Sequence, residues 1–152
     1  AQVIGCCIGC SFIFELIERA PDRVLAAVPM QPIGHDDSNP GTFGPQTWTP
    51  WGQALVEGGA SFDADTLDRF GHGLFDPGFV FSVDRAFLRG VRTPLLLLYG
   101  SDRAHPRGVS EEVVALLPNV EAVERWRDPD VVPEVTEKVR AFLRTHGAEV
   151  DR

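Results

Sequence analysis

Residues 3–17 read VIGCCIGCSFIFELI, and this stretch decides the fold class. Its first residues are apolar and end at Gly5, after which large apolar side chains recur at helical spacing, at positions 12, 13, 16 and 17. A short apolar run followed by this periodicity is typical of a strand, a tight turn and an amphipathic helix. The turn lies between Gly5 and Gly9, and it contains two adjacent cysteines, Cys6 and Cys7.

Two further apolar runs predict strands that are buried on both faces, as in a parallel sheet. The runs are VLAAV at 24–28 and PLLLLY at 94–99, and turn residues bound each of them. A last strand is expected at 120–123, a helix that opens at Ser110 precedes it, and a terminal helix is expected around 135–143. The alternation predicts an α/β fold with a parallel sheet flanked by helices.

A long segment, residues 34–90, interrupts this alternation and divides the chain into a core of residues 1–33 and 91–152 and an insertion. Helical patterns near 49–57 and 64–70 predict a mostly helical lid. Segments of this length between buried strands are usually functional. Aromatic residues of the lid are therefore candidates for the lining of a substrate pocket, namely Trp48, Trp51, Phe75 and Phe79.

The overall charge excludes two classes of partner. Fourteen Lys and Arg stand against 22 Asp and Glu, a formal charge of -8, which would repel both nucleic acid and an anionic membrane surface. No apolar run approaches the roughly 20 residues of a membrane span, and the first residues lack a basic leader. We therefore expect a cytoplasmic protein that binds a small-molecule substrate.

The segment Gly5-Cys6-Cys7-Ile8-Gly9 has the pattern of a nucleophile between small residues. A nucleophile on such a sharp turn has a strained backbone, and small neighbours allow the strand and the helix to approach closely. We expect the helix N-terminus to lower the pKa of the Cys7 thiol. The amide of Ile8 should point at the oxyanion of an acyl-transfer intermediate.

This segment resembles the nucleophile elbow of the α/β-hydrolase fold, with Cys in place of the usual Ser, as in dienelactone-hydrolase-like members. The sequence PDRV at 21–24, the insertion, and TPLLLLYGSD at 93–102 resemble the second half of that fold in order and spacing. The resemblance covers essentially the whole chain but begins at the elbow strand. It implies an uncovered edge beside Val3 and Ile4, filled by a homo-oligomer or by a missing N-terminal half.

The resemblance places Asp102 where the family keeps its catalytic acid. The family's histidine usually follows the last strand, and residues 125–131 contain none. His105, three residues after Asp102, is the best-placed base, although a surface histidine is an equally good reading. His72, in a glycine-rich stretch of the lid, is a second possibility.

The resemblance implies hydrolysis or acyl transfer on a small, fairly apolar ester, lactone or thioester, with Cys7 as nucleophile. No cofactor is expected, since the sequence has no glycine-rich phosphate loop. No metal site is expected either, and His35 with its two neighbouring aspartates is interpreted as part of a polar loop.

Two other functions are compatible with the cysteines. Cys7-Ile8-Gly9-Cys10 is a C-x-x-C at the start of a helix, which thiol-disulfide oxidoreductases and redox sensors use. Alternatively, the chain is a non-catalytic ligand-binding member of the hydrolase fold.

Overall fold

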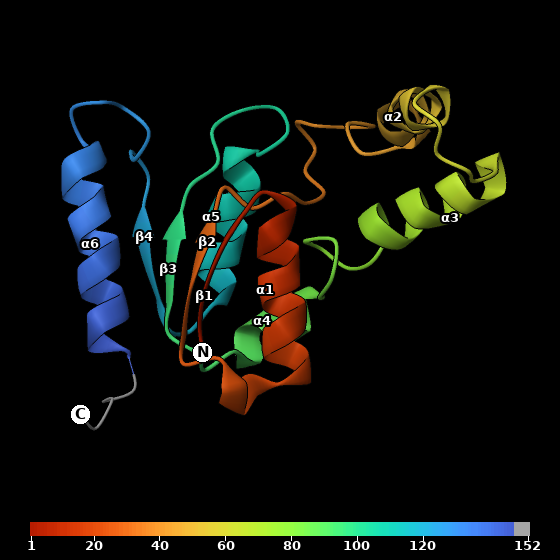
Figure 1. Cartoon of the computed structure of the whole chain (residues 1–152). Coiled ribbons are helices and arrows are strands. Elements are labelled where there is room, and N and C mark those ends of the chain that lie inside the picture. The colour runs from red at the N-terminus through yellow and green to blue at the C-terminus, as the bar shows by residue number, and fades with distance from the viewer. Residues whose placement is uncertain (148–152) are drawn as a thin grey trace.

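A four-stranded parallel sheet forms the centre of the chain in a computed structural model, which describes residues 1–147. The strands are β1 (Gln2–Cys6), β2 (Ala26–Met30), β3 (Leu95–Leu98) and β4 (Val120–Val123), and they lie side by side in that order (Figure 1). Their carboxyl ends therefore meet at one edge of the sheet. The prediction of a parallel α/β fold is confirmed.

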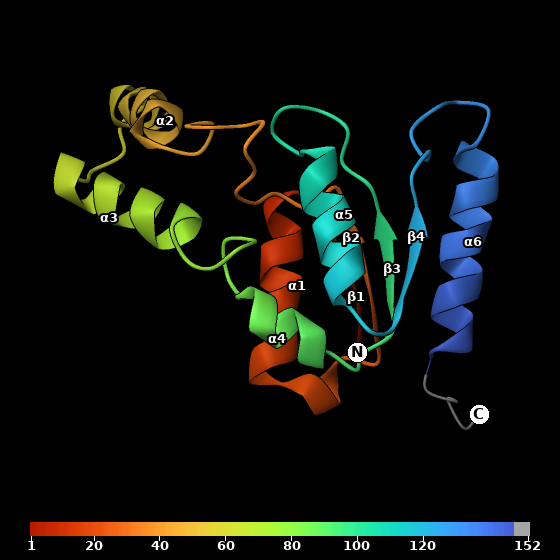
Figure 2. The ribbon, with the colours of Figure 1, turned by 180° about the vertical axis from the view of Figure 1, so that it is seen from behind.

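Helices cover the two faces of the sheet unequally. On one face lie α1 (Ile8–Arg19), α4 (Arg85–Gly90) and α5 (Arg107–Leu116), which stand in front of the strands in Figure 2. On the other face, α6 (Val132–Thr145) is the one helix among residues 1–147, and it packs beside β4 and β2. A 3-10 turn at Pro21–Arg23 joins α1 to β2.

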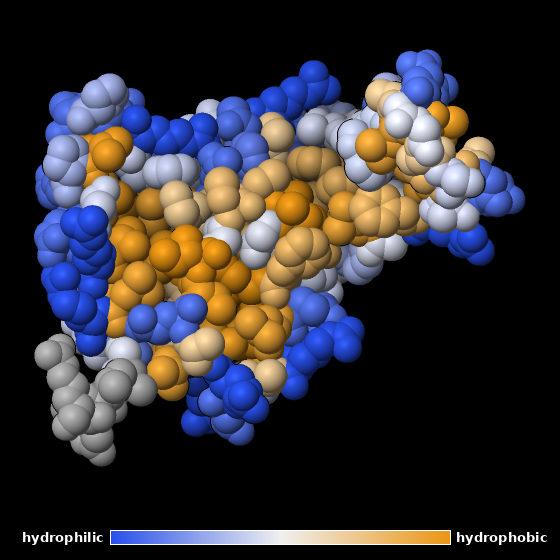
Figure 3. Space-filling model, viewed as in Figure 1, coloured by the Kyte–Doolittle hydropathy of each residue, from blue (hydrophilic) through white to orange (hydrophobic). Residues whose placement is uncertain are grey.

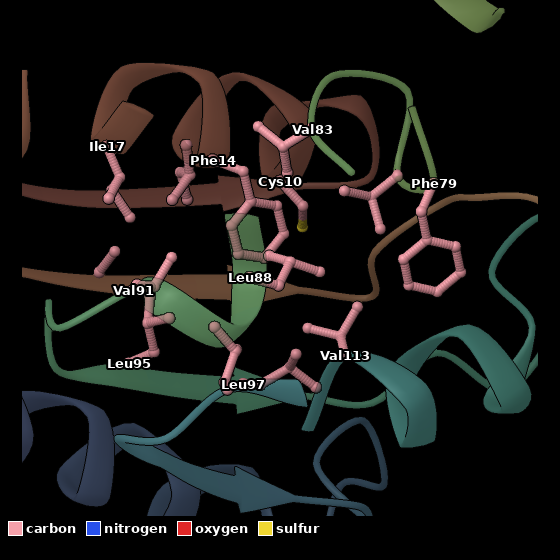
Figure 4. Packing of buried hydrophobic residues seen from close by; sticks show 14 of the residues in the cluster. Cys10, Phe14, Ile17, Phe79, Val83, Leu88, Val91, Leu95, Leu97 and Val113 are labelled. Carbon is pink, nitrogen blue, oxygen red and sulfur yellow. The ribbon is translucent and has the colours of Figure 1, made fainter. Parts of the chain in front are cut away.

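The core follows from the alternation of side chains along the strands. Leu95 and Leu97 of β3 point to the face of α1 and α5, where they pack in a cluster that contains Phe14 and Val113 (Figure 4). The intervening leucines of β3 point to the α6 face and contact a smaller cluster around Phe142. The uninterrupted LLLL run is thus buried on both sides, as the sequence predicts.

Some predicted boundaries are wrong. The second strand is Ala26–Met30 rather than 24–28, so it continues through Pro29, which pairs with Gly5 of β1. The helix expected to open at Ser110 begins three residues earlier, at Arg107. Ser110 is buried, and its hydroxyl accepts a hydrogen bond of 2.9 Å from the Gly100 N–H. It anchors the loop after β3 and does not cap α5.

Within the predicted lid, residues 34–90, the helices α2 (Pro45–Glu57) and α3 (Ala64–Phe75) pack against each other, whereas α4 at its end packs beside α5 on the sheet. Both views show α2 and α3 extending away from the sheet on the side of α1 (Figures 1 and 2). Their contact is tight, because a Cβ on Gly71 would lie 2.2 Å from the ring of Trp48, and one on Gly52 would lie 2.1 Å from Leu67. The lid therefore has a small core of its own.

The two glycines of the elbow differ in what they allow. A Cβ on Gly5 would lie 2.5 Å from the Gly9 carbonyl oxygen and 2.9 Å from Ile13 Cδ1, so only glycine permits this approach of β1 and α1. A Cβ on Gly9 would have no neighbour within 4 Å. The expectation that both positions must be small is right for Gly5 and wrong for Gly9.

We expect Gly5→Ala to destabilise the fold by about 2–4 kcal/mol, because backbone must move to admit the methyl group. Gly9→Ala is the matched control, and it should be neutral or stabilise by up to about 1 kcal/mol, since alanine favours a helix. Urea unfolding of both variants gives the comparison. Equal effects at the two positions would contradict the assigned packing.

Among residues 1–147, no strand pairs with the outer edge of β1, and apolar side chains lie on both sides of it. Ile4 is 56% exposed on the α6 face, and Phe12 of α1 is 58% exposed on the other. Beside Ile4, a groove of about 590 Å³ separates the sheet from α6, and Met30, Leu98 and Val139 contribute to its lining. Figure 3 shows the resulting broad hydrophobic area across the middle of this face.

Association through β1 is the outcome we expect, because unpaired strand edges and exposed apolar side chains favour pairing with another chain. At micromolar concentration the 16.7 kDa chain should sediment as a dimer or larger species. Ile4→Lys should shift it toward monomer, whereas Leu55→Lys, on the exposed surface of α2, should not. A monomeric wild-type chain would contradict this prediction.

Candidate active site

Cys7 occupies the turn between β1 and α1 in a conformation that few non-glycine residues adopt. Its φ is 59° and its ψ is -123°, and it is the N-cap residue of α1. Its N–H donates a 3.0 Å hydrogen bond to the Met30 carbonyl oxygen, which fixes the turn to the end of β2. Strained backbone of this kind is concentrated at functional sites. The predicted elbow geometry is present.

Burial determines the acidity of the Cys7 thiol. It raises the pKa of Cys7 above the ordinary value, and the N–H of Ile8 opposes the shift without overcoming it. The neighbouring Cys6 and the carboxylate of Asp102 raise the pKa further. The expectation of an acidified thiol at the helix N-terminus is therefore wrong, because desolvation of the thiolate outweighs the hydrogen bond from the Ile8 N–H.

Cys10 does not face Cys7. Its side chain is fully buried in the core cluster, and its Sγ donates to the carbonyl oxygens of Gly5 at 3.4 Å and Met30 at 3.2 Å (Figure 4). Burial raises the pKa of this thiol strongly. A thiol held this way has no exposed sulfur for disulfide exchange, so the structure does not favour the Cys7-x-x-Cys10 interpretation.

Asp102 and His105 form a hydrogen-bonded pair in the loop after β3. His105 Nδ1 lies 2.7 Å from Asp102 Oδ1, which also accepts the N–H groups of Ala104 and His105. Burial raises the pKa of the Asp102 carboxyl, but the hydrogen bonds from His105 outweigh it and hold the pKa below the usual range. An acid that orients a histidine through Nδ1 is the arrangement expected of a catalytic pair.

The other nitrogen of His105 is enclosed. The imidazole is 13% exposed, and Nε2 is buried and lacks a hydrogen-bond partner within residues 1–147. No hydrogen bond joins His105 to Cys7 in this part of the chain. Proton exchange with Cys7 would therefore require the loop at 101–106 to expose Nε2.

His72 lies far from this edge in the fold. It belongs to the last turn of α3 rather than to a flexible turn, and its Nδ1 contacts Asp76 Oδ2 at 2.8 Å. Its ring also meets the ring of Trp48 edge-on, with centroids 5.2 Å apart. These contacts hold His72 against the pair of lid helices α2 and α3, which we call the lid hairpin.

The four aromatic residues proposed for the pocket do not share one cavity lining. Trp48 is buried between α2 and α3, where its Nε1 donates to Asp68 Oδ1 at 3.0 Å, and Phe75 stacks on it. Trp51 is half-exposed and stacks on Phe70 of α3, with ring centroids 5.9 Å apart. Phe79 is buried in the main core, with the guanidinium of Arg85 4.1 Å from its ring centre.

Two residues that the sequence analysis missed complete the edge. Gln31 follows β2 with a φ of 46°, and its N–H donates 2.7 Å to the Leu98 carbonyl oxygen. Arg127 follows β4, and its guanidinium bonds both to Gln31 Oε1 and to Asp102 Oδ2, the latter at 3.4 Å. Each strand is thus followed at its carboxyl end by a side chain of this edge: Cys7, Gln31, Asp102 and Arg127.

Neither a metal site nor a membrane helix is found within the described chain. No group of three or more potential ligands lies together among residues 1–147. None of the helices there is long and apolar enough to cross a membrane.

Comparison with family models and with curated protein sequences finds no match. Among solved structures, the chain is similar to MGS-MChE2, an α/β hydrolase enzyme from a lagoon-sediment metagenome, with a TM-score of 0.62 and 14% identity. The chain has the α/β-hydrolase fold. The alignment covers 95% of this chain and 61% of that one, so the chain spans less than two thirds of this hydrolase's length.

Two other structures show the same fold at similar distance. A meta-cleavage product hydrolase from Pseudomonas fluorescens has a TM-score of 0.62 and 14% identity, over 97% of this chain and 65% of its own. BpoC from Mycobacterium tuberculosis, named a putative non-heme bromoperoxidase, has a TM-score of 0.61 and 16% identity. The alignment covers 97% of this chain and 68% of BpoC. At these identities the likeness concerns the fold.

The pKa of Cys7 leads to a pH prediction. Because the thiolate is the reactive form and its pKa is raised, alkylation by iodoacetamide should accelerate about tenfold per pH unit from pH 7 to 9. Cys10 should be labelled only after unfolding. Rates mapped by mass spectrometry check both statements. A Cys7 rate that levels off below pH 8 would mean that the helix N-terminus outweighs burial.

Proposed function

We propose that this chain carries the nucleophile and the acid of a hydrolase or acyltransferase of the α/β-hydrolase fold, acting on a small ester, lactone or thioester. The observation that carries the proposal is Cys7, a nucleophilic side chain held at positive φ where β1 turns into α1. Hydrolase-fold neighbours, among them a naproxen esterase from Bacillus subtilis at 19% identity, support a hydrolytic function of this general type.

The reaction assigns one step to each group. The Cys7 thiolate attacks the acyl carbon, and the oxyanion that forms is bound by the N–H of Ile8, which lies in the first turn of α1 where helix amides lack intrahelical partners. The carbon–oxygen or carbon–sulfur bond then breaks, and the leaving group takes a proton. Water or another acceptor attacks the acyl-thioester and restores Cys7.

His105 is the proposed proton carrier, and Asp102 its orienting acid. The 2.7 Å contact at Nδ1 would fix the tautomer whose Nε2 accepts the proton of Cys7. A base is needed here more than in most thiol enzymes, because burial of Cys7 disfavours its thiolate. Movement of the loop 101–106 would bring Nε2 to the thiol.

For the cell compartment, the cysteines support the cytoplasm as part of the proposal. All three thiols are free, which fits a reducing compartment such as the cytoplasm.

Hydrolysis of p-nitrophenyl esters by matched variants tests the proposal. Cys7→Ala should abolish activity, whereas Cys6→Ala, which removes the exposed neighbouring thiol, should retain it. His105→Gln should lower kcat by about 10²-fold to 10⁴-fold, the usual contribution of a general base. His72→Gln is its control, since His72 also has an aspartate on Nδ1 but lies on the lid.

The outcomes separate the remaining interpretations. Equal activity in wild type and Cys7→Ala would refute the catalytic assignment and favour a binding protein on the hydrolase fold. Loss with Cys7→Ala but not with His105→Gln would keep the nucleophile and transfer the base to another group.

A further inference from the structure

Arg127 is the one side chain in residues 1–147 that bonds to residues from two other strand ends at this edge. Its guanidinium donates to Gln31 Oε1 after β2 and to Asp102 Oδ2 after β3. The guanidinium also lies over the ring of Trp126, with Cζ 4.9 Å from the ring centre. Trp126 is itself fixed, because its Nε1 donates a 2.7 Å hydrogen bond to the Tyr99 carbonyl oxygen. The cation is held in place by three independent contacts.

One partner of this cation, Gln31, lies beside the elbow turn. Gln31 directly follows Met30, whose carbonyl oxygen binds the Cys7 N–H at 3.0 Å. Neighbouring strands are about 4.8 Å apart, so the Gln31 backbone at the end of β2 lies about one strand spacing from the end of β1, where Cys7 begins the turn. Asp102, the other partner of Arg127, acts on the charge of the Cys7 thiol.

Arg127 retains capacity for a further partner. A guanidinium has five N–H donors, and the described residues occupy two of them. The contact with Asp102 is 3.4 Å, longer than the roughly 2.7–2.9 Å of a strong charged hydrogen bond. The side chain is 39% exposed, so solvent or a ligand can reach it.

An anionic substrate would need a cation at this edge, because the net charge of the chain and the charge of Asp102 are both negative. The chain has a formal charge of -8, and the ionised Asp102 lies at the same edge as Cys7. Both would repel a carboxylate. Arg127 offsets Asp102 at this point, and its planar fork matches the geometry of a carboxylate.

We propose that Arg127 is a specificity-determining residue that binds a carboxylate on the acyl group of the substrate, so that the preferred substrates are half-esters or half-thioesters of small dicarboxylic acids. This inference rests on the proposed function for its reaction. Its binding step is independent of turnover, because it concerns only whether Arg127 attracts an anion to Cys7.

Alkylation of Cys7 tests the binding step directly. Iodoacetate and iodoacetamide are similar in size and react alike, since the thiolate displaces iodide, but only iodoacetate carries a carboxylate. The measurement is the ratio of their rates at Cys7 in a Cys6→Ala background at pH 8.5, divided by the same ratio for glutathione. Arg127→Gln should lower this ratio about fivefold at low ionic strength, and added salt should reduce the difference.

Two variants separate charge from structure. Arg127→Lys keeps the charge and should retain most of the preference for iodoacetate. Arg125→Gln removes a cation from the same loop that pairs with Asp128 and Asp130, and it should leave the ratio unchanged. An equal ratio in wild type and Arg127→Gln would overturn the proposal, as would an equal fall in Arg125→Gln.

Turnover provides the second arm. For mono-p-nitrophenyl succinate, Arg127→Gln should raise KM about tenfold, while KM for neutral p-nitrophenyl acetate should stay within about twofold. Cys7-dependent hydrolysis without this difference would refute the carboxylate site alone. Absence of Cys7-dependent hydrolysis would refute the proposed function, and the alkylation ratio would then decide whether Arg127 binds anions.

Discussion

A hydrogen bond of 3.0 Å from the Cys7 N–H to the Met30 carbonyl oxygen ties the end of β1 to the end of β2 where the chain turns into α1. The turn requires a φ of 59° at Cys7, and it brings the first turn of α1 so close to β1 that Gly5 has no room for a side chain. Cys10, one turn along α1, then falls into the core. The same constraint therefore separates the two thiols, one toward the site and one away from it.

At Cys7, the backbone geometry and the acidity of the thiol are set by different contacts. Two opposing effects act on the Cys7 thiol, the first-turn amide of α1 and the removal of water around the sulfur, and the second is larger. The turn thus presents the Cys7 side chain in an elbow geometry, while burial raises its pKa and favours the thiol form. In the proposed reaction, activation falls to Asp102 and His105, which the loop after β3 holds together while keeping Nε2 enclosed.

The sheet could be predicted from the sequence because each of its buried strands is an apolar run, and runs of this kind have few alternative structures. The elbow could be predicted because Gly5 and Cys7 carry a recognisable local pattern. Arg127 could not, since an arginine in a polar loop has the same local signal as any solvated one, and its partners lie 25 and 96 residues away. The helix start predicted at Ser110 is wrong for a related reason. A serine that caps a helix and a serine whose hydroxyl binds a distant amide have the same local sequence signal.

The lid leads to a consequence for how such a chain can diversify. Trp48 packs against Gly71 inside the hairpin of α2 and α3, and the helices owe their mutual contact to residues that the sheet does not touch. Trp51 and Phe70, each about half exposed, stack on each other across α2 and α3 with ring centroids 5.9 Å apart, so substitutions there remove one surface contact of the hairpin and are separate from the packing of Trp48 on Gly71. The exposed surface of the lid can therefore change by single substitutions, each without altering the side chains at the strand ends.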